Sequence, residues 1–182
     1  MAVAQVGATV GGIAANLALA ARYVRRAAAR GADLVVFPEC FLQGYSLTRS
    51  TLDLSEPVSG PAVTALAAIA ARSDVAIVAG MIETNPADPR KPFNTAVVIG
   101  RDGRLVGAYR KTHLFDRERD AFAAGDEYPV FDLLPGRGRP SLRLGVCICF
   151  DVEFPEVPRL LALGGAQLIG RASCRERVLL GV

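Results

Sequence analysis

Tryptophan is absent from this chain of 182 residues, and histidine occurs only once, at His113. A single imidazole argues against a zinc site, and the four cysteines, Cys40, Cys147, Cys149 and Cys174, lack metal-binding spacing. We therefore expect no metal and no cofactor. Cys147 and Cys149 are too close along one predicted strand for an unstrained disulfide, so we expect free thiols and a cytoplasmic location.

An excess of charge of one sign is also missing. The formal net charge is +3, from 21 basic and 18 acidic residues. Three arginines and one glutamate in the last dozen residues supply +2 of this charge, which leaves 18 basic and 17 acidic residues elsewhere. Because no basic patch interleaved with aromatic residues remains, we predict no nucleic-acid partner.

The sequence lacks an apolar run of the kind that spans a membrane. Its first 21 residues carry no charged side chain, but alanine and glycine dominate them, and Gln5, Thr9 and Asn16 interrupt them. The positive charges follow this stretch, whereas a signal peptide has them in front. We expect no membrane segment here, but a strand, a glycine-rich turn and an amphipathic helix.

Strand-like and helix-like patterns alternate along the rest of the chain, which is 51% hydrophobic with a mean hydropathy of +0.30. This composition is typical of one globular domain. The alternation predicts an α/β layered fold with a mixed sheet. Strands are predicted at 2–6, 34–37, 75–82 and 142–148 and from 166, helices at 13–30, 61–72 and 155–163, and a hairpin at 95–99 and 104–109.

Three side chains that can do chemistry stand at the ends of predicted strands. Glu39 closes LVVFPE, Lys111 lies in GAYRKTHLF, and Cys149 ends the apolar run of GVCICFDVEFPE. Open α/β sheets bind ligands at strand carboxyl ends, so we expect the three to converge on one edge of a sheet. A thiol at a strand-to-helix turn meets backbone N–H groups that can stabilise an oxyanion, which makes Cys149 the candidate nucleophile. Cys147, in mid-strand, is predicted to be a buried apolar thiol.

These motifs resemble the nitrilase family of carbon–nitrogen hydrolases, from about Val3 to Leu168. The resemblance implies a four-layer α-β-β-α sandwich, incomplete here. It also implies catalytic roles for three residues: Glu39 as general base, Lys111 as the cation that stabilises the oxyanion, and Cys149 as the nucleophile.

Two supporting groups are also implied by the resemblance. The backbone N–H after the nucleophile, that of Phe150, would bind the oxyanion together with Lys111. A second glutamate would position the lysine, and we favour Glu118, which is closer to the Lys111 segment than Glu127 is. Asp116 is a weaker candidate for this position.

The activity implied by the resemblance is hydrolysis of a non-peptide carbon–nitrogen bond through a cysteine thioester. We expect a small linear amide or N-carbamoyl compound as substrate, ahead of a nitrile, and a homo-oligomer when the protein is full length. An acyltransferase would use the same residues. A papain-like Cys–His pair using His113 is disfavoured, because the surroundings of Glu39 and Lys111 would then be coincidences.

A catalytically inactive fragment is the remaining alternative, because the family's domain continues well beyond the nucleophile and only 33 residues follow Cys149. The family-like pattern stops at GGAQLI. The next string, IGRASCRERV, is also the translation of ATC GGA AGA GCG TCG TGT AGG GAA AGA GTG, the sequence of a short-read sequencing adapter. We therefore expect residues 1–168 to form the hydrolase domain and residues 169–182 to be a non-native tail.

Overall fold

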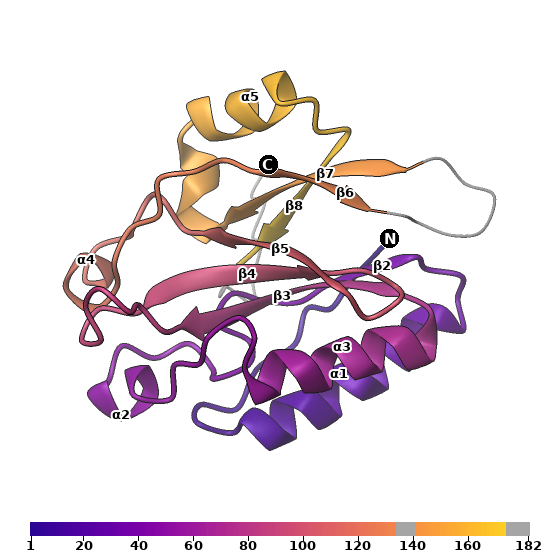
Figure 1. Ribbon diagram of the computed structural model, residues 1–182, viewed down its shortest axis with the longest axis horizontal. Helices are drawn as coiled ribbons and strands as arrows, with labels where there is room; N and C mark the ends of the chain where they lie inside the picture. Colours follow the sequence, from indigo (N-terminus) through magenta and orange to yellow (C-terminus); the bar gives the residue numbers. More distant parts are fainter. Residues whose placement is uncertain (134–140, 174–182) are drawn as a thin grey trace, which may run out of the picture.

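Two β-sheets face each other in the computed structural model of this protein, which describes residues 1–133 and 141–173 (Figure 1). The first sheet has the strand order β1-β2-β3-β4-β5, and the second has the order β6-β7-β8. The first sheet comprises β1 (Ala2–Val3), β2 (Leu34–Val36), β3 (Ala76–Glu83), β4 (Phe93–Ile99) and β5 (Leu105–Arg110). The second comprises β6 (Val130–Leu133), β7 (Leu142–Ile148) and β8 (Leu168–Ala172).

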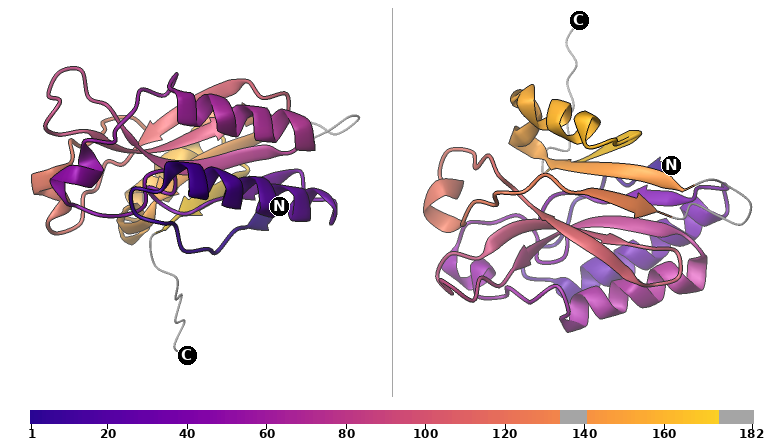
Figure 2. Two further views of the ribbon diagram at one scale, coloured as in Figure 1. Left: turned by 90° about the horizontal axis from the view of Figure 1, so that it is seen from below. Right: turned by 45° about the horizontal axis from the view of Figure 1, so that its top comes forward.

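Helices cover the outer faces of both sheets (Figures 1 and 2). The helices α1 (Ile13–Ala28) and α3 (Pro61–Ser73) lie against the five-stranded sheet, and α5 (Glu156–Leu163) lies against the three-stranded sheet. Two short helices, α2 (Arg49–Leu52) and α4 (Glu118–Ala121), lie in connecting segments. The layers therefore follow the order α-β-β-α, the fold expected from the resemblance.

The apolar side chains divide into cores according to the face of the strand on which they lie. In β3, Ile77 and Ala79 pack in the core beneath α1 and α3, whereas Val78 packs between the two sheets. Successive side chains of a strand point to opposite faces, and β3 is buried on both. This explains why the sequence of β3 is a continuous apolar run and does not alternate between apolar and polar residues.

Most predicted elements form within a few residues of their predicted bounds. The predicted strand at 2–6 pairs with β2 over Ala2–Val3 only, and the structure adds β6 and the short helices α2 and α4, which the sequence analysis did not predict. Within the described ranges, 1–133 and 141–173, no helix is long and apolar enough to cross a membrane.

Gly80 brings strand β3 and the Glu39 segment together. Its N–H donates to the carbonyl of Pro38 at 3.1 Å, and its carbonyl accepts from the N–H of Leu42 at 3.0 Å. An added Cβ at Gly80 would lie 2.3 Å from the backbone nitrogen of Cys40. Since real Cβ atoms do not approach backbone that closely, only glycine allows the segment to pack against the strand here.

Candidate active site

Glu39 is held in the interior by the turn that follows β2. Pro38 precedes it, and Cys40 follows it in the left-handed region with φ of 47°. This conformation is uncommon for a residue other than glycine and reverses the chain sharply. The Glu39 side chain is buried at this turn, and the residue is only 2% exposed.

Lys111 follows β5 and forms two ion pairs inside the protein. Its Nζ lies 2.7 Å from Oε1 of Glu39 and 2.7 Å from Oε2 of Glu118, and Lys111 is 1% exposed. The preceding Arg110 points to the other face of the sheet, where it pairs with Glu83 at 2.6 Å. Strand periodicity thus separates two adjacent cations, one into the interior and one to the surface.

Glu118 is fixed at the start of α4 by a complete set of donors. Oε1 accepts from the hydroxyl of Tyr45 at 2.9 Å and from Nδ2 of Asn94 at 3.3 Å. Oε2 accepts from Lys111 and, at 2.7 Å, from the N–H of Phe115. A carboxylate with both oxygens satisfied can be buried without a large penalty, and this explains why Glu118 is 1% exposed.

Asn94 joins the two glutamates from strand β4. Its Nδ2 donates to Oε1 of Glu39 at 2.7 Å as well as to Glu118, and its backbone carbonyl accepts from the N–H of Lys111. Its Oδ1 is the one buried side-chain N or O atom without a hydrogen-bond partner among the residues that the structure describes. Asn94 therefore contributes a donor to each carboxylate of the network.

The buried network contains two carboxyl groups, those of Glu39 and Glu118, and one ammonium group, that of Lys111. Burial raises the pKa of Glu39 to about 7, although Lys111 pulls it down, and the nearby Cys149 adds to the rise. Burial alone would lower the pKa of Lys111, but Glu39 and Glu118 hold it above its ordinary value. The arrangement keeps the lysine charged and leaves Glu39 able to take up or release a proton near neutral pH.

Cys149 begins a 3₁₀ turn (Cys149–Glu153) directly after strand β7 and has φ of 46°. It is half-buried, unlike the fully buried Cys40 and Cys147. Burial raises the pKa of the Cys147 thiol to about 11 and that of Cys40 well above its ordinary value. Because the thiolate is the reactive form, these shifts make Cys40 and Cys147 the poorer nucleophiles.

The candidate residues converge, but not as the sequence analysis predicted. Glu39 and Lys111 follow strands of the five-stranded sheet, whereas Cys149 follows a strand of the opposite sheet. The expectation that all three lie on one edge of one sheet was therefore wrong. The site lies where the ends of strands from both sheets meet, and Cys149 is near enough to Glu39 to contribute to the raised pKa of that carboxyl.

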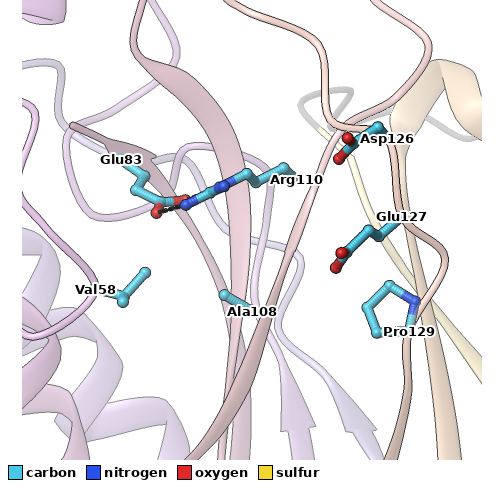
Figure 3. A pocket seen from close by; sticks show the side chains of 7 residues that line it. All are labelled: Val58, Glu83, Ala108, Arg110, Asp126, Glu127 and Pro129. Carbon is cyan, nitrogen blue, oxygen red and sulfur yellow. Dashed lines mark hydrogen bonds and ion pairs between the residues drawn. The ribbon is translucent and has the colours of Figure 1, made fainter. Parts of the chain in front are cut away.

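The competing acidic residues lie elsewhere. Glu127 is exposed and lines a surface pocket with Asp126, Glu83 and Arg110 (Figure 3). Asp116 is exposed and has φ of 46°. Glu118, in contrast, contacts Lys111 directly.

His113 and Phe150 lie in an aromatic cluster beside the site. The His113 ring stacks on Phe154 at 3.9 Å, and its Nδ1 lies 2.9 Å from Oγ1 of Thr112. The Phe150 ring contacts Phe115 and Phe154 edge-on, with centroids 5.0 and 5.1 Å apart. Within residues 1–133 and 141–173, no cluster of three or more His, Cys, Asp or Glu side chains could hold a metal ion.

Two residues of the site, the buried Asn94 and the partly buried Tyr45, were not assigned roles at the site in the sequence analysis. A signal was available for Asn94, which interrupts the apolar strand sequence FNTAVVI, because a polar residue in a buried strand requires a partner. Tyr45 lies in a segment without periodic pattern and gave no comparable signal.

The carbon-nitrogen hydrolase family matches residues 1–179 of the chain. The chain belongs to this family. A hydrolase of Pseudomonas protegens, named for its position in the pqqF 5' region, is 40% identical over 144 residues, which are 78% of this chain and 48% of that protein. The omega-amidase of Homo sapiens is 32% identical over 163 residues, which are 85% of this chain and 56% of the relative. The chain thus spans about half the length of these curated relatives.

Solved structures of an amidase from Nesterenkonia sp. AN1 share the fold. One, a variant with the acetamide moiety of fluoroacetamide added covalently at the active-site cysteine, superimposes with a TM-score of 0.81 at 28% identity. The match covers 94% of this chain and 63% of the amidase chain. A second variant, in complex with acrylamide, gives a TM-score of 0.79 at 27% identity with the same coverage. This family member is accordingly related to amidases in both sequence and structure.

Proposed function

We propose that this site hydrolyses a small linear amide or an N-carbamoyl compound, with Cys149 as nucleophile, Glu39 as general base and Lys111 as oxyanion stabiliser. The observation that carries the proposal is the buried Glu39–Lys111–Glu118 network beside a half-buried cysteine at the start of a sharp turn. The family membership and the small amides bound by the Nesterenkonia amidase support the substrate class.

In the first half-reaction, Glu39 takes the proton from the Cys149 thiol, and the sulfur attacks the carbonyl carbon of the amide. The resulting oxyanion is stabilised by the Lys111 ammonium and the backbone N–H of Phe150. The proton held by Glu39 passes to the leaving nitrogen as the C–N bond breaks. Ammonia or an amine leaves, and the acyl group remains on Cys149 as a thioester.

In the second half-reaction, Glu39 removes a proton from a water molecule, which attacks the thioester carbon. The carboxylic acid leaves, and the proton returns to the sulfur. A pKa near neutrality suits a group that acts as base and acid in turn, and the value of about 7 for Glu39 meets this requirement. Glu118 would hold the lysine in place and make no bond to substrate.

Fluoroacetamide tests the proposal without requiring turnover. The Cys149 sulfur should displace fluoride, so that peptide mapping by mass spectrometry finds the acetamide moiety on Cys149 and not on Cys40 or Cys147. Cys149→Ala should abolish labelling of the folded protein, whereas iodoacetamide, a more reactive reagent, should label every thiol of the urea-unfolded protein. Equal labelling of all folded-state thiols, or labelling that persists on Cys147 alone, would contradict the proposal.

Turnover is measured separately as ammonia release from small amides, with Cys149→Ala as the matched inactive variant. Hydrolysis that continues in Cys149→Ala, or that requires an added amine acceptor, would contradict the assigned reaction. The acceptor requirement would identify acyl transfer instead.

A further inference from the structure

Asp151 is a fully buried carboxylate for which the proposed reaction provides no role. It is 0% exposed and lies in the 3₁₀ turn two residues after Cys149. Among the ion pairs of the described part of the chain no lysine or arginine is paired with it, and its basic neighbour is the His113 imidazole, whose Nδ1 lies 3.4 Å from Oδ1. A buried carboxylate without such a cation is costly unless hydrogen bonds satisfy it, so its donors show what it holds together.

The donors come from both catalytic segments. Oδ2 accepts from the N–H of Ile148, which precedes Cys149, at 2.8 Å, and from the hydroxyl of Tyr109 at 2.8 Å. Oδ1 accepts from the N–H of His113 at 3.0 Å and from the hydroxyl of Thr112 at 3.3 Å. Tyr109, Thr112 and His113 flank Lys111 in the sequence on both sides.

One side chain thus joins the end of β7 to the end of β5 and the residues that follow it, and the two strands belong to different sheets. We propose that Asp151 is a positioning residue that holds the Lys111 segment against the Cys149 turn and so sets the distance between the ammonium and the sulfur. The inference rests on the proposed function for the chemistry of Cys149 and Lys111. It identifies Asp151 as the group that connects the Lys111 segment in one sheet to the Cys149 turn in the other.

Asparagine cannot replace this carboxylate. Each carboxylate oxygen accepts from one backbone N–H and one hydroxyl, so an amide NH₂ in either orientation would face a backbone donor. The Tyr109 hydroxyl could turn to accept, but the N–H of Ile148 or His113 could not. Asp151→Asn keeps the shape of the side chain and should loosen one of the two segments.

A double-mutant cycle tests the proposal. The rate constant for alkylation of Cys149 by iodoacetamide, resolved by peptide mapping, is measured for the wild type, Lys111→Met, Asp151→Asn and the double variant. Lys111→Met should slow alkylation about tenfold or more in the wild-type background, because the cation favours the thiolate. The same substitution should change the rate less than about twofold beside Asp151→Asn, since the lysine is no longer held near the sulfur.

Asp132→Asn is the matched control background, because Asp132 is a carboxylate of strand β6 whose side chain is 75% exposed. In the Asp132→Asn background, Lys111→Met should slow alkylation of Cys149 as much as it does in the wild type. Additive effects of Lys111→Met and Asp151→Asn would overturn the proposal, since a merely structural carboxylate would lower stability without changing the coupling. The proposal is also overturned if Lys111→Met does not change the alkylation rate of Cys149 in the otherwise wild-type protein.

Two milder substitutions form a second double-mutant cycle. It tests the positioning role of Asp151 if one of the variants in the first cycle does not fold. Tyr109→Phe removes one donor from Asp151 and keeps the ring, and Glu39→Gln removes the charge that Lys111 holds beside the sulfur. Non-additive effects on the alkylation rate support the proposal, and additive effects overturn it. Alkylation does not require turnover, so a failure of amide hydrolysis would contradict the proposed function and leave the outcome of the cycle valid.

Discussion

The Nζ atom of Lys111 lies 2.7 Å from Oε1 of Glu39, and neither side chain is exposed by more than 1%. An ion pair in this environment cannot be justified as a source of stability, because desolvation of both charges offsets much of their attraction. With Glu118 as a second partner of the lysine, two buried carboxyl groups share one ammonium in the interior. Such a cost is expected at functional sites rather than in structural cores.

Removal of the buried cation should cost far more stability than removal of its neighbour on the chain. Lys111→Met leaves two carboxylates buried without a counter-charge, and we expect a loss of about 3 to 5 kcal/mol. Arg110→Met breaks an ion pair in which the arginine side chain is 46% exposed and the Glu83 side chain 5% exposed. Glu83 keeps the hydrogen bond from Thr95, and we expect a loss of about 1 to 2 kcal/mol. Urea unfolding of the two variants measures the difference. Equal losses would show that the Lys111 network is not sealed from water.

The elevated pKa of Glu39 should appear in the pH dependence of stability. The pKa is about 7 in the folded protein and 4.5 as its ordinary value, so the folded state holds a proton that the unfolded state has lost between these values. Stability contributed by this group is therefore complete below pH 4.5 and is lost as the pH rises towards 7. Glu39→Gln removes the titration.

The difference in unfolding free energy between wild type and Glu39→Gln isolates this group from all others. We expect the wild type to lose about 1 to 3 kcal/mol relative to the variant as the pH rises through the window. Under the proposed function, turnover by the wild type should rise through the same pH range, because the base must be unprotonated. If the difference in unfolding free energy between the two proteins does not change with pH, the raised pKa of Glu39 is contradicted.

The sequence was sufficient to predict the strands and helices that contain long apolar runs. It was insufficient for strands that form only because they pair with another part of the chain. Strand β7 forms over Leu142–Ile148, as its apolar run predicts. Strand β6 has only four residues, VFDL, too few for a periodic signal, and it forms because it pairs with β7. Local propensity could not reveal that pairing.

The same division applies to the site. The position of Cys149 at a strand end was visible in the sequence, whereas the choice of Lys111 over Arg110 depended on the family resemblance. The structure shows the physical difference, because the two side chains lie on opposite faces of the sheet and meet different glutamates. Asp151 lies within the motif that contains Cys149, but three of its four donors, at Tyr109, Thr112 and His113, lie about 40 residues away in the sequence. Contacts at that separation do not follow from local pattern.

Glu118 and Glu127 form a matched pair for the second-glutamate assignment. In Glu118→Gln, an amide NH₂ in either orientation meets donors, Lys111 and Phe115 on one side or Tyr45 and Asn94 on the other. We expect a stability loss of about 2 to 4 kcal/mol and a turnover loss of about a hundredfold or more. Glu127→Gln, at an exposed pocket wall, should change stability by less than about 0.5 kcal/mol. A larger turnover loss in Glu127→Gln would reverse the assignment.

Gly80→Ala should damage the site through the backbone. Its Cβ would lie 2.3 Å from the Cys40 nitrogen and 2.5 Å from the Pro38 carbonyl, so the turn that carries Glu39 must move. We expect a loss of about 3 kcal/mol or more and slower alkylation or turnover at Cys149. Gly31→Ala is the control, since its Cβ would meet nothing within 4 Å and its φ of +73° alone causes strain. That control should cost about 1 to 2 kcal/mol, and a comparable cost at Gly80 would contradict the close-approach argument.

The last prediction concerns the origin of the residues from Ile169 onwards, which we propose are the translation of a sequencing adapter and not of the gene. Strand β8, Leu168–Ala172, pairs with β7 through backbone groups, and such pairing places little demand on side-chain identity at Gly170 and Arg171. The strand is thus compatible with either origin, and the family match reported above extends to residue 179, through most of the proposed tail. Residues 174–182 lie outside the described part of the chain. The locus should be amplified from genomic DNA and sequenced by a method that uses no ligated adapter.

We expect that genomic reading frame to depart from the present sequence at or near Ile169 and to continue with alternating strand and helix patterns. The departure should fall there because IGRASCRERV is, from its first residue, the amino-acid sequence that the adapter encodes. An unrelated locus amplified and sequenced in the same way is the control for the method. Genomic codons for the segment from Arg171 to Val178 would contradict the proposal and make Ser173, whose hydroxyl lies 3.6 Å from the Cys149 sulfur, a native neighbour of the candidate nucleophile.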